Sequence, residues 1–255
     1  MTPISLQLWS VRTHASADFP AMIAKVAKAG YDGVETAGYG NVDATTAAKA
    51  ITDNGLKVSG MHVGIARLRT ELTQVAVEAH ALGSPHIICP FLPPPLFTSA
   101  SACQALGEEL NEIGARLRGL GFSFHYHNHA HEIAIVDGRR ALDWLLDAAE
   151  PRNLGCQLDV YWAHVGGKPP ADYIREQGRR IRLLHIKDEA ELGSGPVDFP
   201  PIFAAASSIG AVEWHIVEIE KYNHDPLESA RLSLETLRGW TASSACAGVQ
   251  GRARH

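Results

Sequence analysis

The stretch Phe122-Ser-Phe-His-Tyr-His-Asn-His-Ala-His-Glu132 combines the pattern of a β-strand with an unusual density of ionisable side chains. It follows the turn residues Gly119-Leu120-Gly121, and its aromatic residues favour a strand. Because side chains alternate between the two faces of a strand, the pattern predicts His125, His127, His129 and His131 on one face. Neutral imidazole is a frequent metal ligand and a natural acid or base near neutral pH. We therefore expect this strand to form one wall of a functional site, with some of the histidines serving as ordinary core residues.

On both sides of this stretch, short apolar runs alternate with longer amphipathic segments. The predicted strands are Ile4–Trp9, Gly33–Thr36, Lys57–His62, His86–Cys89, Phe122–His129, Gly155–Val160, Ile181–Lys187 and Val212–Glu218. A helix is predicted after each strand: Phe19–Lys28, Ala44–Asn54, Ile65–Leu82, Ser101–Leu120, Arg139–Ala149, Pro170–Arg179, Pro200–Ser208 and Pro226–Trp240.

Strict alternation of strands and helices implies a parallel sheet, and eight such units close a barrel. The alternative, an open doubly wound sheet, lacks its early Gly-x-Gly-x-x-Gly turn in this chain. We therefore predict an α/β fold, a single-domain (β/α)8 TIM barrel over residues 1–240. A flexible C-terminal tail rich in Ala, Ser, Gly and Arg is predicted over residues 241–255.

The composition excludes several classes of protein. With 255 residues, 45% of them hydrophobic, the chain can bury a large core. A net charge of -5 argues against nucleic acid as a partner. Four scattered cysteines, the lack of a signal peptide and the lack of a membrane-length apolar run favour a soluble cytoplasmic protein with reduced thiols. The oligomeric state stays open, and a homo-oligomer is compatible with the sequence.

Ionisable side chains recur at the predicted carboxyl ends of the strands, where barrels of this kind carry their chemistry. His127, Asp159, His185 and Glu218 are separated by 32, 26 and 33 positions, each about one βα unit, so they should meet at one rim. Two histidines and two carboxylates suit a divalent ion such as manganese, zinc, cobalt or magnesium. The alternative is a metal-free network of ion pairs.

Eight motifs in register resemble the sugar phosphate isomerase/epimerase group of the xylose isomerase-like TIM barrel superfamily, which also contains endonuclease IV. They cover about residues 4 to 240 and are Gln7-Leu-Trp-Ser-Val-Arg12, Gly30-Tyr-Asp-Gly-Val-Glu35, Gly60-Met-His-Val63, Tyr126-His-Asn-His129, Leu158-Asp-Val-Tyr-Trp162, His185-Ile-Lys-Asp188, Gly193-Ser-Gly-Pro-Val-Asp198 and Val217-Glu218.

The resemblance implies a metal site and a departure from it. Ketose epimerases of the family hold one divalent ion, here expected to be manganese with magnesium, cobalt or zinc as alternatives. Their ligands are a Glu, an Asp, a His and a Glu on strands five to eight, and the last three carry over to Asp159, His185 and Glu218. On strand five, His127 stands where the family has Glu, so either His127 replaces it or Glu132 reaches back from the loop. His127 is the preferred ligand because it lies at the strand end.

The reaction that the resemblance implies is proton abstraction next to the carbonyl of a sugar, through an ene-diolate. Glu218 is the first choice for an acid/base group, and His127, His129 or Glu132 is the second. The missing strand-five Glu puts simple 3-epimerisation in doubt. A lyase or dehydratase that eliminates from a keto-sugar or 3-keto-glycoside is therefore the alternative enzyme.

Further rim residues are expected to bind the substrate. Glu35 and His62 would contact its hydroxyls, or else brace two strands against each other. Lys187 would neutralise an anionic group, or pair with Asp159 or Glu218. Trp9, Trp162 and Phe91 would form an apolar wall for a sugar ring, unless they belong to the core. The turn at 193–198 is a weak signal for a phosphate nest.

Two further classes stay as minor alternatives. An abasic-site endonuclease would use three zinc ions and a basic surface, which the acidic balance disfavours. A sugar-binding barrel without catalysis would not need the Asp159, His185 and Glu218 set.

Overall fold

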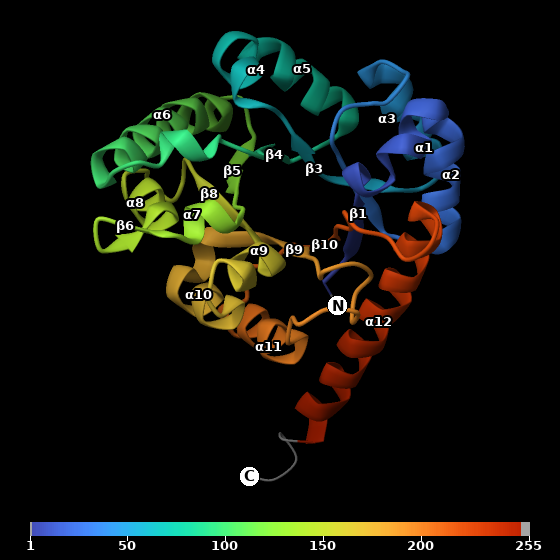
Figure 1. Cartoon of the computed structure of the whole chain (residues 1–255). Coiled ribbons are helices and arrows are strands. Elements are labelled where there is room, and N and C mark those ends of the chain that lie inside the picture. The colour runs from blue at the N-terminus through green and yellow to red at the C-terminus, as the bar shows by residue number, and fades with distance from the viewer. Residues whose placement is uncertain (1, 251–255) are drawn as a thin grey trace.

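The computed structural model describes residues 2–250, and for residues 243–250 it describes the backbone alone. Within this range eight parallel strands close a barrel in the order β1-β10-β9-β8-β5-β4-β3-β2. They are β1 (Ile4–Gln7), β2 (Gly33–Thr36), β3 (Lys57–His62), β4 (His86–Cys89), β5 (Ser123–His127), β8 (Gly155–Asp159), β9 (Ile181–Ile186) and β10 (Trp214–Val217). In Figure 1 the strands lie at the centre and the helices surround them. The predicted (β/α)8 barrel is confirmed.

Helices on the outer face connect the strands. They are α1 (Arg12–Ala17), α2 (Phe19–Ala29), α3 (Ala44–Asp53), α4 (Ile65–Thr70), α5 (Leu72–Leu82), α6 (Ala100–Gly119), α7 (Ala130–Ile133), α8 (Ala141–Asp147), α9 (Val160–Val165), α10 (Pro170–Gln177), α11 (Phe199–Ile209) and α12 (Pro226–Gln250). A small antiparallel hairpin, β6 (Ile135–Val136) and β7 (Arg139–Arg140), lies outside the barrel. The single helix predicted over Ile65–Leu82 is wrong, because the non-helical backbone of Glu71 separates α4 from α5.

Local sequence signals explain where several helices begin and end. The side chains of Asp18, Asp43 and Ser99 accept hydrogen bonds from backbone N–H groups in the first turns of α2, α3 and α6. Gly30 and Gly210 end α2 and α11 in the left-handed region, which glycine adopts without a steric penalty. These signals are local, which is why the sequence could place these elements.

The apolar core has two parts, one outside the sheet and one inside the barrel, and the inner part lies below the site. Most buried apolar side chains pack between the strands and the helices. Inside the barrel, a small layer consists of Ile88, Leu183, Trp214 and Ile216. Above this layer, toward the carboxyl ends of the strands, the interior side chains are polar and buried. Burying a polar group costs free energy unless it is hydrogen-bonded or paired with a charge, so these side chains require polar partners.

The C-terminal helix continues beyond the predicted end of the domain. The backbone of α12 is helical to Gln250, so residues 241–250 of the predicted tail belong to this helix. Figure 1 shows α12 running along the outside of the barrel and extending away from it. Residues 251–255 of the predicted tail lie outside the described residues, and the domain boundary at residue 240 stays a prediction.

Candidate active site

Four residues predicted as metal ligands come from consecutive barrel strands and lie together. His127 ends β5, Asp159 ends β8, His185 is on β9 and Glu218 follows β10. All four side chains are buried, and one nitrogen or oxygen of each lies within 4.8 Å of those of the other three. The parallel register that pairs Asp159 with His185 brings their side chains to the same height in the barrel. The structure therefore contains a cluster with a donor set that could hold one metal ion.

Asp159 has a buried oxygen without a hydrogen-bond partner among the described residues. Its Oδ1 accepts a hydrogen bond of 2.9 Å from the backbone N–H of Trp162 at the start of α9, whereas its buried Oδ2 has no partner in the described part of the chain. Burial raises the pKa of Asp159 to about 7, with Lys187 opposing and Glu218 reinforcing the shift. An unpaired, buried carboxylate oxygen costs free energy, and a cation would satisfy it.

The spacing of His185 and Glu218 also fits a metal ion. His185 Nδ1 lies 3.1 Å from Glu218 Oε2. Two atoms bound side by side to one divalent ion, each at roughly 2.1 Å, are about 3 Å apart. The residues present therefore suit a divalent cation in both donor type and spacing.

Lys187 balances the negative charge of the cluster. Its ammonium lies 3.4 Å from Glu218 Oε2 and 2.8 Å from Glu220 Oε2, and it stacks 5.0 Å from the centre of the Trp162 ring. Although burial opposes ionisation of Glu218, Lys187 and His185 outweigh it and lower the pKa of that carboxyl. Lys187 is almost fully buried and pairs with Glu218, which corresponds to the second of the two roles predicted for it.

Glu35 is the hub of a buried hydrogen-bond network beneath the cluster. Its Oε2 accepts from His185 Nε2 at 2.6 Å, from Gln7 Nε2 at 2.7 Å and from His62 Nε2 at 2.9 Å. Its Oε1 accepts from Gln157 Nε2 at 2.6 Å. Glu35 is fully buried and does not line the pocket, so its geometry matches the predicted bracing role rather than the predicted substrate contact.

The two glutamines of this network were missed by the sequence interpretation. Gln7 and Gln157 are fully buried amides on the interior faces of β1 and β8. The available signal was Gln157 itself, an uncharged polar residue placed two positions before Asp159 and hence on the same face of the strand.

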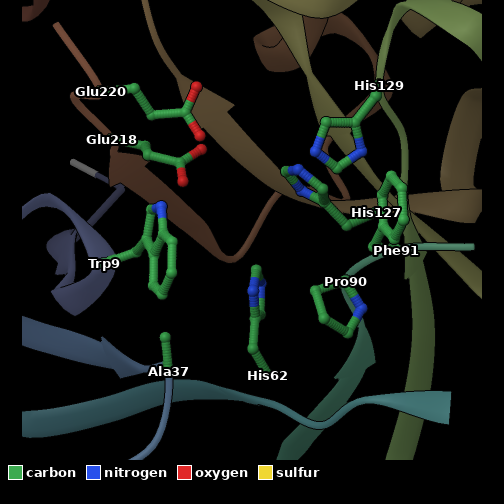
Figure 2. Close-up of a pocket in the computed structure, with 9 residues that line it drawn as sticks. All are labelled: Trp9, Ala37, His62, Pro90, Phe91, His127, His129, Glu218 and Glu220. Carbon is green, nitrogen blue, oxygen red and sulfur yellow. The ribbon is translucent and has the colours of Figure 1, made fainter. Parts of the chain in front are cut away.

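A pocket of about 520 Å³ opens above the cluster. Its lining consists of Trp9, Ala37, His62, Pro90, Phe91, His127, His129, Glu218 and Glu220. Figure 2 shows Trp9 and Phe91 on opposite sides, with the imidazoles of His127 and His129 on the side of Phe91 and the two carboxylates on the other. Trp9 and Phe91 are 46% and 44% exposed, so both offer apolar surface to a bound molecule. Trp162, predicted to join this wall, is not part of the lining and packs against His129 and Lys187 instead.

The prediction that four histidines share one face of a strand is wrong. β5 ends at His127, His129 immediately precedes α7, and His131 lies within that helix. His125 does face the interior, but it lies two residues before His127, in the middle of the strand, where its Nε2 lies 3.1 Å from His86 Nδ1. Only His127 and His129 therefore reach the pocket.

Glu132 is not brought to the metal cluster. Its Oε1 accepts from the Tyr126 hydroxyl at 2.6 Å and its Oε2 from the backbone N–H of His129 at 2.8 Å. Because these bonds fix the first turn of α7, the carboxylate is committed to local structure. Of the two strand-five candidates, His127 is the one that joins Asp159, His185 and Glu218.

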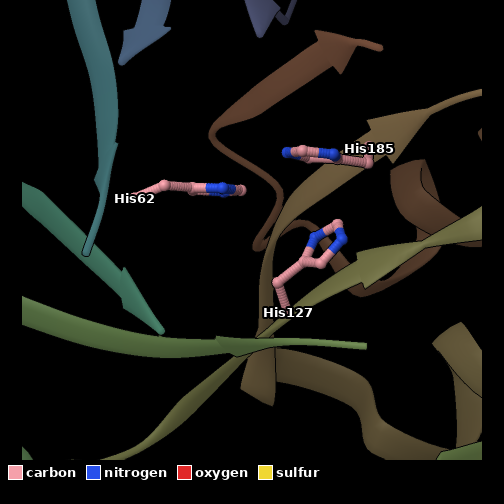
Figure 3. A group of neighbouring side chains, drawn as sticks. All are labelled: His62, His127 and His185. Atoms are coloured by element: carbon pink, nitrogen blue, oxygen red, sulfur yellow. The ribbon is translucent and has the colours of Figure 1, made fainter. Parts of the chain in front are cut away.

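Three imidazoles, those of His62, His127 and His185, face one another at the floor of the site (Figure 3). The rings of His62 and His185 are nearly parallel at 5.5 Å, and that of His127 is tilted by 62° to His185 at 4.5 Å. Burial lowers the pKa of His127, with the neighbouring imidazoles adding to the effect. His185 differs: despite its burial, Glu35 and Glu218 raise its pKa to about 10.

Among the described residues, no helix combines the length and apolar character needed to cross a membrane.

Comparison with known proteins agrees with this fold. Residues 23–240 match the model of the xylose isomerase-like TIM barrel family. A sugar phosphate isomerase/epimerase from Parabacteroides distasonis ATCC 8503 is 25% identical with a TM-score of 0.82, over 91% of this chain and 92% of that one. No curated protein matches the sequence.

Two epimerases show the same fold at lower identity. L-ribulose 3-epimerase is 18% identical with a TM-score of 0.80, over 100% of this chain and 99% of its own. D-allulose 3-epimerase from Methylomonas sp., in complex with D-allulose, is 17% identical with a TM-score of 0.73, over 94% and 98%. With the family model covering most of the barrel, the chain belongs to the xylose isomerase-like TIM barrel family.

Proposed function

We propose that this chain is a divalent-metal-dependent sugar isomerase or epimerase. The observation that carries the proposal is the convergence of His127, Asp159, His185 and Glu218 at the floor of a pocket with apolar walls. These four residues would hold the ion, and manganese is the first choice, with magnesium, cobalt or zinc as alternatives. When bound, such an ion polarises a substrate carbonyl and stabilises the charge that develops when the neighbouring carbon loses a proton.

Glu218 is proposed as the base that takes this proton. It lines the pocket, and Lys187 together with His185 keeps its pKa low, so the carboxylate is ionised at neutral pH. A base that also contacts the ion is held close to the acidic carbon of a bound sugar.

His129 is proposed as the second acid/base group. It lies on the opposite side of the pocket from Glu218 (Figure 2), and burial lowers its pKa, which favours the neutral imidazole. Its buried Nδ1 has no hydrogen-bond partner in the part of the chain that the structure describes. A neutral imidazole can take up a proton and then donate it, so His129 could return a proton on the other face or to the neighbouring carbon.

The pocket favours an uncharged sugar over a sugar phosphate. None of its nine lining residues is Lys or Arg, and Glu218 and Glu220 would repel a phosphate. The turn predicted as a phosphate nest is already filled, because Asp188 Oδ2 accepts from the backbone N–H groups of Gly193 at 3.1 Å and Gly195 at 3.0 Å. A sugar ring between Trp9 and Phe91 would instead use the apolar walls.

Elimination from a keto-sugar is the second candidate reaction, favoured by one observation. With Glu132 committed to α7, the strand-five side of the pocket offers the imidazoles of His127 and His129 but no carboxylate. An imidazole in this place that has taken up a second proton could protonate a leaving group after Glu218 has removed the neighbouring proton, and it would then return to its neutral form.

Both reactions can be tested through their shared first step. The protein with Mn²⁺ is incubated in D₂O with uncharged ketoses, the corresponding sugar phosphates and keto-glycosides, and exchange is followed by NMR. We expect deuterium at the carbon next to the carbonyl of an uncharged substrate. An altered sugar alone indicates isomerisation or epimerisation, whereas release of water or an aglycone indicates elimination. Glu218→Gln should slow exchange by roughly 10²-fold or more. If no substrate exchanges a proton with any of the four metals, the proposal fails.

A further inference from the structure

Beneath the proposed ligands, Glu35 on β2 and Gln157 on β8 meet across the barrel interior. Both side chains are fully buried, neither lines the pocket, and Gln157 Nε2 donates to Glu35 Oε1 at 2.6 Å. The other end of the Gln157 amide faces two imidazoles. Its Oε1 lies 2.8 Å from His62 Nε2 and 3.1 Å from His127 Nδ1.

The orientation of the Gln157 amide follows from its partners. A carboxylate only accepts hydrogen bonds, so the amide nitrogen must face Glu35 and the amide oxygen must face the imidazoles. Gln7 shows the same logic, because its Oε1 accepts from the backbone N–H of Trp9 at 3.0 Å and its Nε2 therefore faces Glu35. The two amides donate to different oxygens of Glu35, which defines that residue as an acceptor.

These contacts fix which nitrogen of each proposed histidine ligand is turned toward the ion. An amide oxygen at His127 Nδ1 requires Nδ1–H, which leaves Nε2 with the lone pair. At His185 the order is reversed, because Nε2–H donates to Glu35. Its Nδ1, 3.1 Å from Glu218 Oε2, also carries a hydrogen in the metal-free protein and would release it when a cation binds.

The same network separates two overlapping groups of metal-binding side chains. His62, His127 and His185 form one such group, and His127, Asp159, His185 and Glu218 form the other. His62 Nε2 lies within 2.9 Å of two acceptors, Gln157 Oε1 and Glu35 Oε2, so its hydrogen is used within this network. The other group contains Asp159 Oδ2, a buried oxygen without a partner among the described residues. The set with two carboxylates is therefore the one prepared for the ion.

We propose that Gln157, held by Glu35, is a positioning residue that sets the tautomer of His127 and so controls metal affinity without contacting the metal. The inference rests on the metal site of the proposed function. Partners of this kind orient metal-binding histidines, and their loss typically lowers metal affinity by roughly 10–100-fold.

The test compares Gln157→Met with Gln7→Met in metal-free, ¹⁵N-histidine-labelled protein. Gln7 is the matched control, because it also donates from a buried amide to Glu35, and its hydrogen bonds involve no imidazole. Two-bond ¹H–¹⁵N spectra report the tautomer of each histidine. We expect the Nδ1–H form of His127 in wild type and Gln7→Met, and a substantial population of the Nε2–H form in Gln157→Met. By calorimetry, Mn²⁺ affinity should fall by roughly 10–100-fold in Gln157→Met and stay close to wild type in Gln7→Met.

The inference is overturned if His127 keeps the Nδ1–H form in Gln157→Met, or if both variants lose the same Mn²⁺ affinity. Should Gln157→Met fail to fold, Gln157→Glu provides the second variant, because a carboxyl group protonated on the oxygen that faces Glu35 can donate to Glu35 and still accept from both imidazoles. Retention of the Nδ1–H form in that variant supports the inference and its loss overturns it. Neither measurement needs turnover, so a protein with the expected tautomers and Mn²⁺ affinity but no activity on sugars would overturn the proposed reaction alone.

Discussion

Replacement of Gly60 by alanine should disturb the site from beneath without changing any polar group. Gly60 is on β3 beside the Glu35 hub, and a Cβ at this position would lie 2.6 Å from Ile88 Cδ1 and 2.7 Å from Glu35 Oε1. Ordinary contacts of a methyl group are about 3.5–4.0 Å, so both neighbours, or the backbone of β3, must move by roughly 1 Å. Ile88 belongs to the interior apolar layer, and Glu35 is held by four donors.

The expected cost is that of overpacking a buried site, about 1–3 kcal/mol. For a domain of this size it corresponds to a fall in Tm of roughly 2–12 °C. Any displacement of Glu35 also loosens His185, which bonds to it at 2.6 Å, so the stabilisation by Mn²⁺ should shrink as well. Thermal and urea unfolding followed by circular dichroism, with EDTA and with Mn²⁺, measure both effects.

Gly64→Ala is the matched control. Gly64 lies four residues further along at the start of α4 with φ of -61°, and a Cβ there would meet nothing within 4 Å. Its unfolding free energy should stay within about 1 kcal/mol of wild type, and its response to Mn²⁺ should be unchanged. If Gly60→Ala were as stable as Gly64→Ala and responded equally to Mn²⁺, the close packing of β3 against Glu35 would be refuted.

Three further predictions concern charge. Asp159→Asn should leave metal-free stability within about 1 kcal/mol of wild type, because Oδ2 has no partner among the described residues. The same variant should lose the stabilisation by Mn²⁺, roughly 2.7 kcal/mol at 100 times Kd, and an undiminished Tm increase with Mn²⁺ would contradict this. Lys187→Met should cost about 3–5 kcal/mol in urea unfolding by leaving Glu218 and Glu220 without their buried cation, so a variant as stable as wild type would disprove that pairing. Burial lowers the pKa of His215 to about 4, so its contribution to stability, about 3 kcal/mol, is complete above pH 6.5 and is lost as the pH falls from 6.5 to 4. His215→Leu should flatten the pH dependence of the unfolding free energy in this window, and an unaltered slope would rule out His215 as its source.

The barrel could be predicted from the sequence because its signals are local. β2, β3 and β4 begin and end at the predicted residues, since each is a short apolar run bounded by turn residues. The spacing of about one βα unit between His127, Asp159, His185 and Glu218 predicted that they lie at one rim. Closure of the parallel barrel then brings the four side chains together. Such spacing needs no knowledge of which side chains touch.

The prediction for the histidine stretch at 125–131 failed, because the strand is shorter than expected. Alternation predicted one face for four imidazoles, but the strand stops at His127, because the chain turns into α7 and Glu132 bonds back to the N–H of His129. A local hydrogen bond from a side chain to the backbone thus replaced continuation of the strand, and counting alternate residues cannot predict such a bond.

The sequence by itself determined the eight units, the polar rim and the identity of the residues that gather there. Only the tertiary structure decided which groups are partnered: Glu35 with Gln157 across the barrel, Lys187 with Glu220, and Asp159 with no partner at Oδ2. The physical reason is that these contacts depend on closure and on the register shifts in β2–β3 and β8–β9, which set how far each interior side chain reaches. Residue type and spacing fix the position of a side chain along its strand, whereas its hydrogen-bond partner depends on strands distant in sequence.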